Sequence, residues 1–158
     1  MNHAPLTPRR GLGPVMLQTR RASWWQRVRG WAAPDTRVIR VYWHPFWTRA
    51  QVEQAYLHEM AHLSGLPGCV GHGKLFKSLV VRKAREALGV HLPPDAASWS
   101  MADLDWGIVW RSWWQHPENL TPCWSEARVE RWLTAEGASD LAGLRLDAQE
   151  PVQTESGA

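Results

Sequence analysis

The chain has 158 residues, of which 44% are hydrophobic and 21% are charged, so it has the size and balance of one globular domain. These values exclude a collagen-like, coiled-coil or wholly disordered chain. No apolar run approaches the roughly 20 residues that span a bilayer, and the N-terminus lacks the apolar core of a secretory signal. Its two cysteines, Cys69 and Cys123, belong to no CxxC pair, which predicts a reducing, cytoplasmic location.

The net charge of +3 is unevenly distributed along the chain. Residues 1–34 contain six arginines and no acid, whereas residues 136–158 contain five acids and one arginine. These patterns predict a flexible basic arm over residues 1–22, a folded domain over 23–135 and an acidic, disordered tail over 136–158. The basic arm is compatible with nucleic-acid contact and equally with an ordinary solvated terminus.

Capping residues and hydrophobic spacing predict the elements of the domain. Ser23 is placed to cap a short helix, whose apolar side would carry Trp24, Trp25, Val28 and Trp31. The alternating, β-branched segment 37–43 predicts a strand. Further helices are predicted over residues 48–64, 73–88, 101–115 and 125–135, with a short strand at 90–92. Together these elements predict a small α+β domain.

The most informative motif is His-Glu-Met-Ala-His at residues 58–62. Histidines at positions i and i+4 lie one turn apart on the same face of a helix, so His58 and His62 can reach one metal ion. Zinc is bound by such imidazole nitrogens and lowers the pKa of a bound water to near 7. Glu59 is placed to act as the general base toward that water. The pattern therefore predicts a zinc metallopeptidase, with two ordinary histidines as the alternative.

A catalytic zinc site needs a third protein ligand. The metzincin pattern HExxHxxGxxH fails, because its last position is occupied by Gly68. Glu86 is a candidate of the gluzincin kind, although it could instead pair with a nearby arginine. His72 is favoured, because the glycines on either side allow close backbone approach and Phe76 could anchor the following helix in the core. Cys69 could add a fourth ligand or be a buried thiol.

The segment HEMAH followed by GHGKLFK resembles the SprT-like, Spartan-related zinc metalloprotease domain. The similar stretch covers residues 37–89. The resemblance implies a zincin-like fold with its active-site helix on a short sheet, and zinc bound by His58, His62 and His72 with Glu59 as catalytic base. It also implies intracellular proteolysis, often of DNA-bound proteins. The chain lacks the C-terminal zinc ribbon of many such proteins, and its Trp-rich region 99–132 has no counterpart in the family pattern.

Two further features concern possible partners. The predicted helix 73–88 carries four basic residues that are candidates for nucleic-acid contact or for an ordinary solvated face, namely Lys74, Lys77, Arg82 and Lys83. The chain has 12 tryptophans against 2 phenylalanines and 2 tyrosines. Most of them are expected in the core, with the pairs at 24–25 and 113–114 as candidates for stacking on unpaired bases. The predicted partners are a protein or peptide substrate and DNA. The alternative function is a metal-stabilised DNA-binding or adaptor module without proteolytic activity.

Overall fold

One mixed sheet forms a side of the domain. The structure is a computed structural model that describes residues 3–5, 15–23, 25–63 and 71–134. The strands of the sheet are β1 (His3–Pro5), β2 (Met16–Arg21), β3 (Gly30–Ala33) and β4 (Val38–Trp43). Their order is β1-β2-β4-β3; β2 runs parallel to β4, and the two outer strands are antiparallel to their neighbours. β3 is therefore an edge strand.

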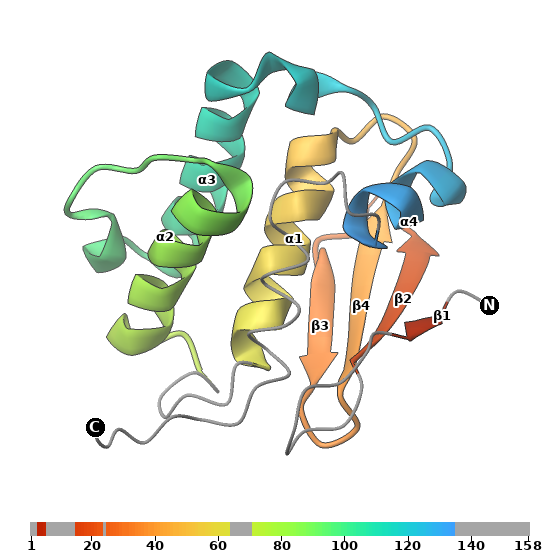
Figure 1. Ribbon diagram of the computed structural model, residues 1–158, viewed down its shortest axis with the longest axis horizontal. Coiled ribbons are helices and arrows are strands. Elements are labelled where there is room, and N and C mark those ends of the chain that lie inside the picture. Colours follow the sequence, from red (N-terminus) through yellow and green to blue (C-terminus); the bar gives the residue numbers. More distant parts are fainter. Residues whose placement is uncertain (1–2, 6–14, 24, 64–70, 135–158) are drawn as a thin grey trace.

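The helices pack around a central one, as Figure 1 shows. The described residues form α1 (Arg49–His62), α2 (Lys74–Leu88), α3 (Met101–Gln115) and α4 (Glu126–Thr134), with 3₁₀ turns at Ala96–Ser98 and Pro117–Leu120. α1 contacts β3 and β4 on one side and α2 and α3 on the other, and α4 packs against α1 and β2. The predicted α+β class is confirmed. None of the helices in the described ranges has the length and apolarity that crossing a bilayer requires.

Three predicted signals for helix ends act as expected. The backbone N–H of Thr48 donates to Gln51 Oε1 at 2.7 Å where α1 begins. Ser100 Oγ accepts from the backbone N–H of Asp103 at 3.1 Å where α3 begins. α2 ends at Gly89, whose φ of +65° is the left-handed conformation that glycine adopts readily. These local signals fix the ends of the helices that surround α1.

The connection between β3 and β4 reaches the end of α1. Arg37 lies in this connection, and its Nη1 donates to the carbonyl oxygen of Leu63 at 3.1 Å. Leu63 follows directly after His62, the last residue of α1. The sheet thus holds the end of the helix that carries the His-Glu-Met-Ala-His motif.

Three predictions for the N-terminal part are wrong. The flexible arm over residues 1–22 includes β2, which pairs with β4, so the folded domain begins before residue 23. The helix predicted after Ser23 is absent from the described residues, where Gly30–Ala33 is a strand. Pairing with β4 supplies the backbone hydrogen bonds that a helix would have made. The tryptophan spacing suggested a helix face, yet Trp31 packs beneath the guanidinium of Arg40 instead.

Two other expectations also need correction. Residues 90–92 form no strand; the side-chain amide of Gln115 bonds to the backbone N–H and carbonyl of His91, at 2.9 and 3.0 Å, in place of a neighbouring strand. Among the described tryptophans only Trp43 is buried. Five of the described tryptophans are about half exposed or more, namely Trp25, Trp106, Trp110, Trp114 and Trp124. The predicted tail, residues 136–158, lies outside the described residues.

Candidate active site

The central helix α1 is buried along most of its length and yet carries polar side chains there. Its buried polar residues are Glu53, Gln54, His58 and Glu59. Buried polar groups need partners, and Glu53 has one in the Nε of Arg49 at 2.9 Å. His58 and Glu59 instead line cavities at the surface. The buried polar face of α1 therefore marks a site.

The three predicted metal ligands meet at one point. His72 Nε2 lies 3.1 Å from His58 Nε2 and 3.2 Å from His62 Nε2. One ligand atom of each histidine lies within 4.8 Å of the other two. Nitrogens held tetrahedrally by one zinc ion, at about 2.0–2.1 Å from it, are separated by about 3.3 Å. The three histidines are therefore close enough to bind one metal ion, as the sequence predicted.

The ring of Phe76 packs against all three histidines of the cluster. His58 and His62 stand one turn apart on α1, and His72 directly precedes Gly73, the residue that caps α2. The fully buried ring of Phe76 stacks on His62, with 4.3 Å between ring centres and an interplanar angle of 21°. Its centre also lies 5.2 Å and 5.3 Å from those of His58 and His72. The predicted anchoring role of Phe76 is confirmed, and the ring also forms the apolar base of the cluster.

Asp105 on α3 is a candidate functional residue that the sequence alone did not identify. Its Oδ1 lies 3.1 Å from His58 Nδ1 and accepts a hydrogen bond from Gln54 Nε2 at 2.7 Å. A carboxylate accepts here, so His58 Nδ1 carries the proton and the neutral ring leaves its lone pair on Nε2, the atom at the cluster. The long separation in sequence hid this pair. The one feature of the sequence that could have pointed to Asp105 is an acidic residue within a predicted helix rich in tryptophan.

Burial and neighbouring charges set the ionisation of the histidines. Burial acts to lower the pKa of His58, but the hydrogen bond and charge of Asp105, together with the charge of Glu59, outweigh it, so the pKa is raised. Burial, together with the charge of His58, lowers the pKa of His72. The His72 ring is thereby favoured in the neutral form, which is the form that binds a metal ion.

Glu59 is a buried carboxyl next to the cluster. It is 8% exposed, and burial raises its pKa to about 7. No hydrogen bond to a described residue engages its carboxyl group. The backbone of β3 passes close to it, because a Cβ added to Gly30 would lie 3.1 Å from Glu59 Cγ. Glu59 thus lines one cavity with the three clustered histidines and lies against the edge strand β3.

Two adjoining cavities form a cleft around these residues. Both are lined by Gly30, His58 and Glu59. One, of about 420 Å³, extends along β3 and is also lined by Trp31, Ala32, Pro34, His62 and His72. The other, of about 280 Å³, extends toward α3 and is also lined by Arg27, Arg29, Gln54, Asp105 and Trp106. The cleft is apolar on the β3 side and charged on the α3 side.

The structure describes one of the alternative metal ligands, Glu86, and does not place it at the histidine cluster. Glu86 is exposed and forms an ion pair with Lys83 at 3.5 Å. Within the described ranges it does not join the histidine cluster. Gly68 and Cys69 lie outside the described residues. The structure therefore brings together His72, and not Glu86, with the two histidines of α1.

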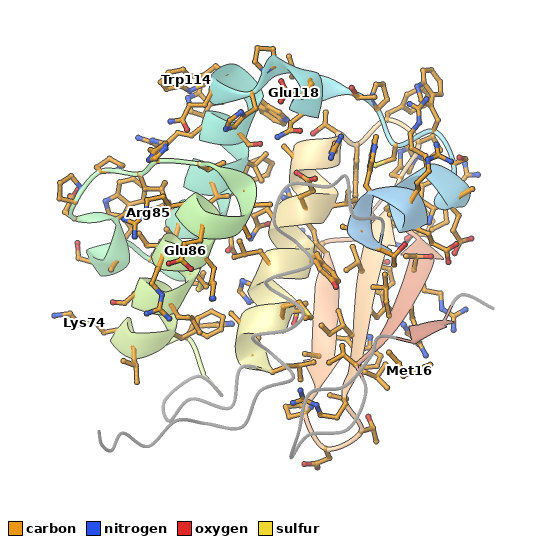
Figure 2. All side chains as sticks on the ribbon, viewed as in Figure 1. Met16, Lys74, Arg85, Glu86, Trp114 and Glu118 are labelled. Carbon is orange, nitrogen blue, oxygen red and sulfur yellow. The ribbon has the colours of Figure 1, made fainter. Side chains whose placement is uncertain are left out.

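The four candidate nucleic-acid contacts on α2 fall into two pairs. Lys74 and Arg82 are exposed, and Figure 2 shows Lys74 at one end of α2 pointing away from α1. Lys77 Nζ donates to the carbonyl oxygen of Trp99 at 2.7 Å, and Lys83 pairs with Glu86. Two of the four side chains therefore have partners within the protein.

Comparison with known proteins returned no similar protein: no family model, no curated protein and no solved structure matches this chain.

Proposed function

We propose that this protein is a zinc-dependent metallopeptidase of the SprT-like kind. The main support is the cluster of three histidines in an open cleft, where His72 Nε2 lies 3.1 Å from His58 Nε2 and 3.2 Å from His62 Nε2. The buried carboxyl group of Glu59 lines the same cleft. The two lone cysteines of the sequence suit a reducing location such as the cytoplasm. A protein or peptide is the proposed substrate.

The donor set suits a catalytic zinc ion. His58, His62 and His72 would hold it, which leaves a coordination position for water or substrate. Imidazole also suits copper, iron and nickel, so zinc is part of the proposal. When bound, zinc supplies a Lewis acid that polarises a carbonyl group and makes water more acidic. Asp105 fixes the orientation and tautomer of His58, which such a site requires.

Glu59 would transfer the proton in peptide hydrolysis. Its carboxylate would take a proton from the attacking water and then donate it to the departing amine. The adjacent edge strand would hold the substrate, because the backbone groups on the outer side of β3 can pair with an extended peptide. A peptide paired there would pass beside Gly30, where a Cβ would lie 3.1 Å from Glu59 Cγ.

Metal content and peptide cleavage test this proposal together. The purified chain is expected to hold about one zinc ion, and His72→Ala to lose it. Glu59→Gln is expected to keep the zinc and to lose cleavage of casein, because the amide cannot accept the proton. His91→Ala is the matched control, since His91 is exposed and outside the cluster. Full zinc content in His72→Ala, or undiminished cleavage by Glu59→Gln, would contradict the proposal.

A second candidate function is binding of single-stranded nucleic acid without proteolysis. The observation that favours it is a row of exposed tryptophans on α3, Trp106, Trp110 and Trp114, which are 49%, 60% and 62% exposed. Residues four positions apart share one face of a helix, and exposed aromatic rings stack on unpaired bases. This function could also accompany peptidase activity, with DNA as a partner.

A further inference from the structure

Arg29 is a partly buried cation at one end of the cleft. Its guanidinium carbon lies 4.2 Å from the centre of the Trp106 ring. Its backbone is also fixed, because its carbonyl oxygen accepts a hydrogen bond from the N–H of Tyr42 at 2.8 Å. Burial lowers the pKa of Arg29, and the charge of Asp105 offsets this only in part. The guanidinium group is thus held against Trp106 and has lost part of its contact with water, which is unfavourable for a charged group.

No carboxylate within the described residues pairs with this guanidinium. Arg29 makes no side-chain hydrogen bond or ion pair there. The nearby Asp105 is already engaged, because Gln54 donates to its Oδ1 and His58 Nδ1 lies 3.1 Å from the same oxygen. A guanidinium offers a planar fork of donors that matches a carboxylate. Arg29 therefore has unused donors in a fixed orientation.

These donors belong to the cavity that contains the proposed catalytic residues. Arg27 and Arg29 line the cavity of about 280 Å³, together with His58 and Glu59. Among the described residues that line the opposite cavity, along β3, the only basic side chains are histidines. A peptide lying along β3 would therefore place one side of its scissile bond near two arginines and the other side near apolar residues.

We propose that Arg29, assisted by Arg27, binds a carboxylate of the substrate on one side of the scissile bond. The inference rests on the proposed peptidase function and adds a substrate preference to it. The carboxylate could belong to a glutamate or aspartate side chain or to the C-terminus of the peptide. In either case the charge is recognised before cleavage, so it contributes to binding as well as to turnover.

Binding to the full-length Glu59→Gln variant, loaded with zinc, tests the inference without any cleavage. Titration calorimetry would compare two pairs of hexapeptides. The members of the first pair have both ends blocked and differ at one position, which is glutamate in one and glutamine in the other. The members of the second pair differ only in having a free or an amidated C-terminus. We expect one charged peptide to bind at least about tenfold more tightly than its neutral match. Adding Arg29→Gln should bring this ratio close to one, whereas Arg131→Gln, at an exposed site on α4, should preserve it.

Cleavage of the same peptides by the unmodified chain gives the second readout. We expect kcat/KM to favour a carboxylate on one side of the scissile bond only, with the ratio lost in Arg29→Gln. Equal binding of charged and neutral peptides, or a preference that persists in Arg29→Gln, would overturn the inference even if peptides are cleaved. Arg29-dependent binding without any cleavage would support it and contradict the peptidase proposal instead.

Discussion

At the residue scale, two carboxylates beside the same histidines have different environments. Asp105 is tied to Gln54 and His58 through one oxygen. The carboxyl group of Glu59 has no hydrogen bond to a described residue, and burial raises its pKa. A carboxylate held by donors suits a positioning role, whereas an unbonded one is available to exchange a proton. In the proposed mechanism, Asp105 would therefore orient His58 and Glu59 would transfer the proton.

The positioning role of Asp105 predicts a loss of zinc affinity in Asp105→Ala. Without this carboxylate, neither the orientation nor the tautomer of His58 is fixed, and we expect affinity to fall by about 10- to 100-fold. Competition with a chromophoric chelator would measure it. Asp103→Ala is the matched control, because Asp103 is exposed in the first turn of the same helix. Equal zinc affinity in the two variants would show that Asp105 does not position the ligand.

At the scale of elements, the site depends on the close approach of β3 to α1. A Cβ added to Gly30 would lie 2.8 Å from the carbonyl oxygen of Arg40 and 3.1 Å from Glu59 Cγ. The first distance is shorter than van der Waals contact and involves backbone, so the strand itself would have to move. The absence of a side chain at Gly30 thus allows β3, β4 and α1 to meet at Glu59.

Gly30→Ala is therefore expected to impair cleavage without removing zinc. Displacing β3 or Glu59 by a few tenths of an ångström disturbs the alignment of base and substrate, and we expect cleavage to fall at least about tenfold. Zinc content should stay at the level of the unmodified chain, because the three histidines lie on α1 and before α2. His91→Ala is the control, since His91 is exposed and lies outside the histidine cluster. The same loss in both variants would contradict this explanation.

The elements that the sequence predicted correctly are those with local signals. Thr48, Ser100 and Gly89 mark helix ends through contacts within a few residues, and the i, i+4 histidines follow from helix geometry. His72 was found because a chemical requirement, a third ligand, limited the candidates.

The elements that were missed depend on distant partners. β2 is a strand because it pairs with β4 about twenty residues later. β3 pairs with β4 across the short connection 34–37, but the tryptophan spacing around it indicated a helix face instead. Asp105 reaches His58 only after α3 has packed against α1. Long-range pairing of this kind leaves little trace in the local spacing of apolar residues.

At the scale of the whole molecule, the tryptophans divide into two groups. Several partly buried ones are covered by arginine guanidinium groups, such as Trp31 by Arg40 and Trp99 by Arg111. In the exposed row on α3, only Trp106 is covered by the guanidinium group of a described arginine. The excess of tryptophan is therefore not a substitute for a core of phenylalanine and tyrosine, and Trp110 and Trp114 present indole rings to solvent.

This exposed row predicts binding of single-stranded DNA. A labelled oligothymidine should bind at low salt, with an affinity that falls steeply as salt rises if basic residues also contribute. Each base stacked on an aromatic ring is worth about 1–3 kcal/mol, so the double variant Trp110→Ala/Trp114→Ala should weaken binding at least about tenfold by fluorescence anisotropy. Trp124→Ala is the control, because Trp124 is similarly exposed but precedes α4 and contacts Phe46. Absence of binding at low salt, or equal weakening by the control, would leave the row without a role in nucleic-acid recognition.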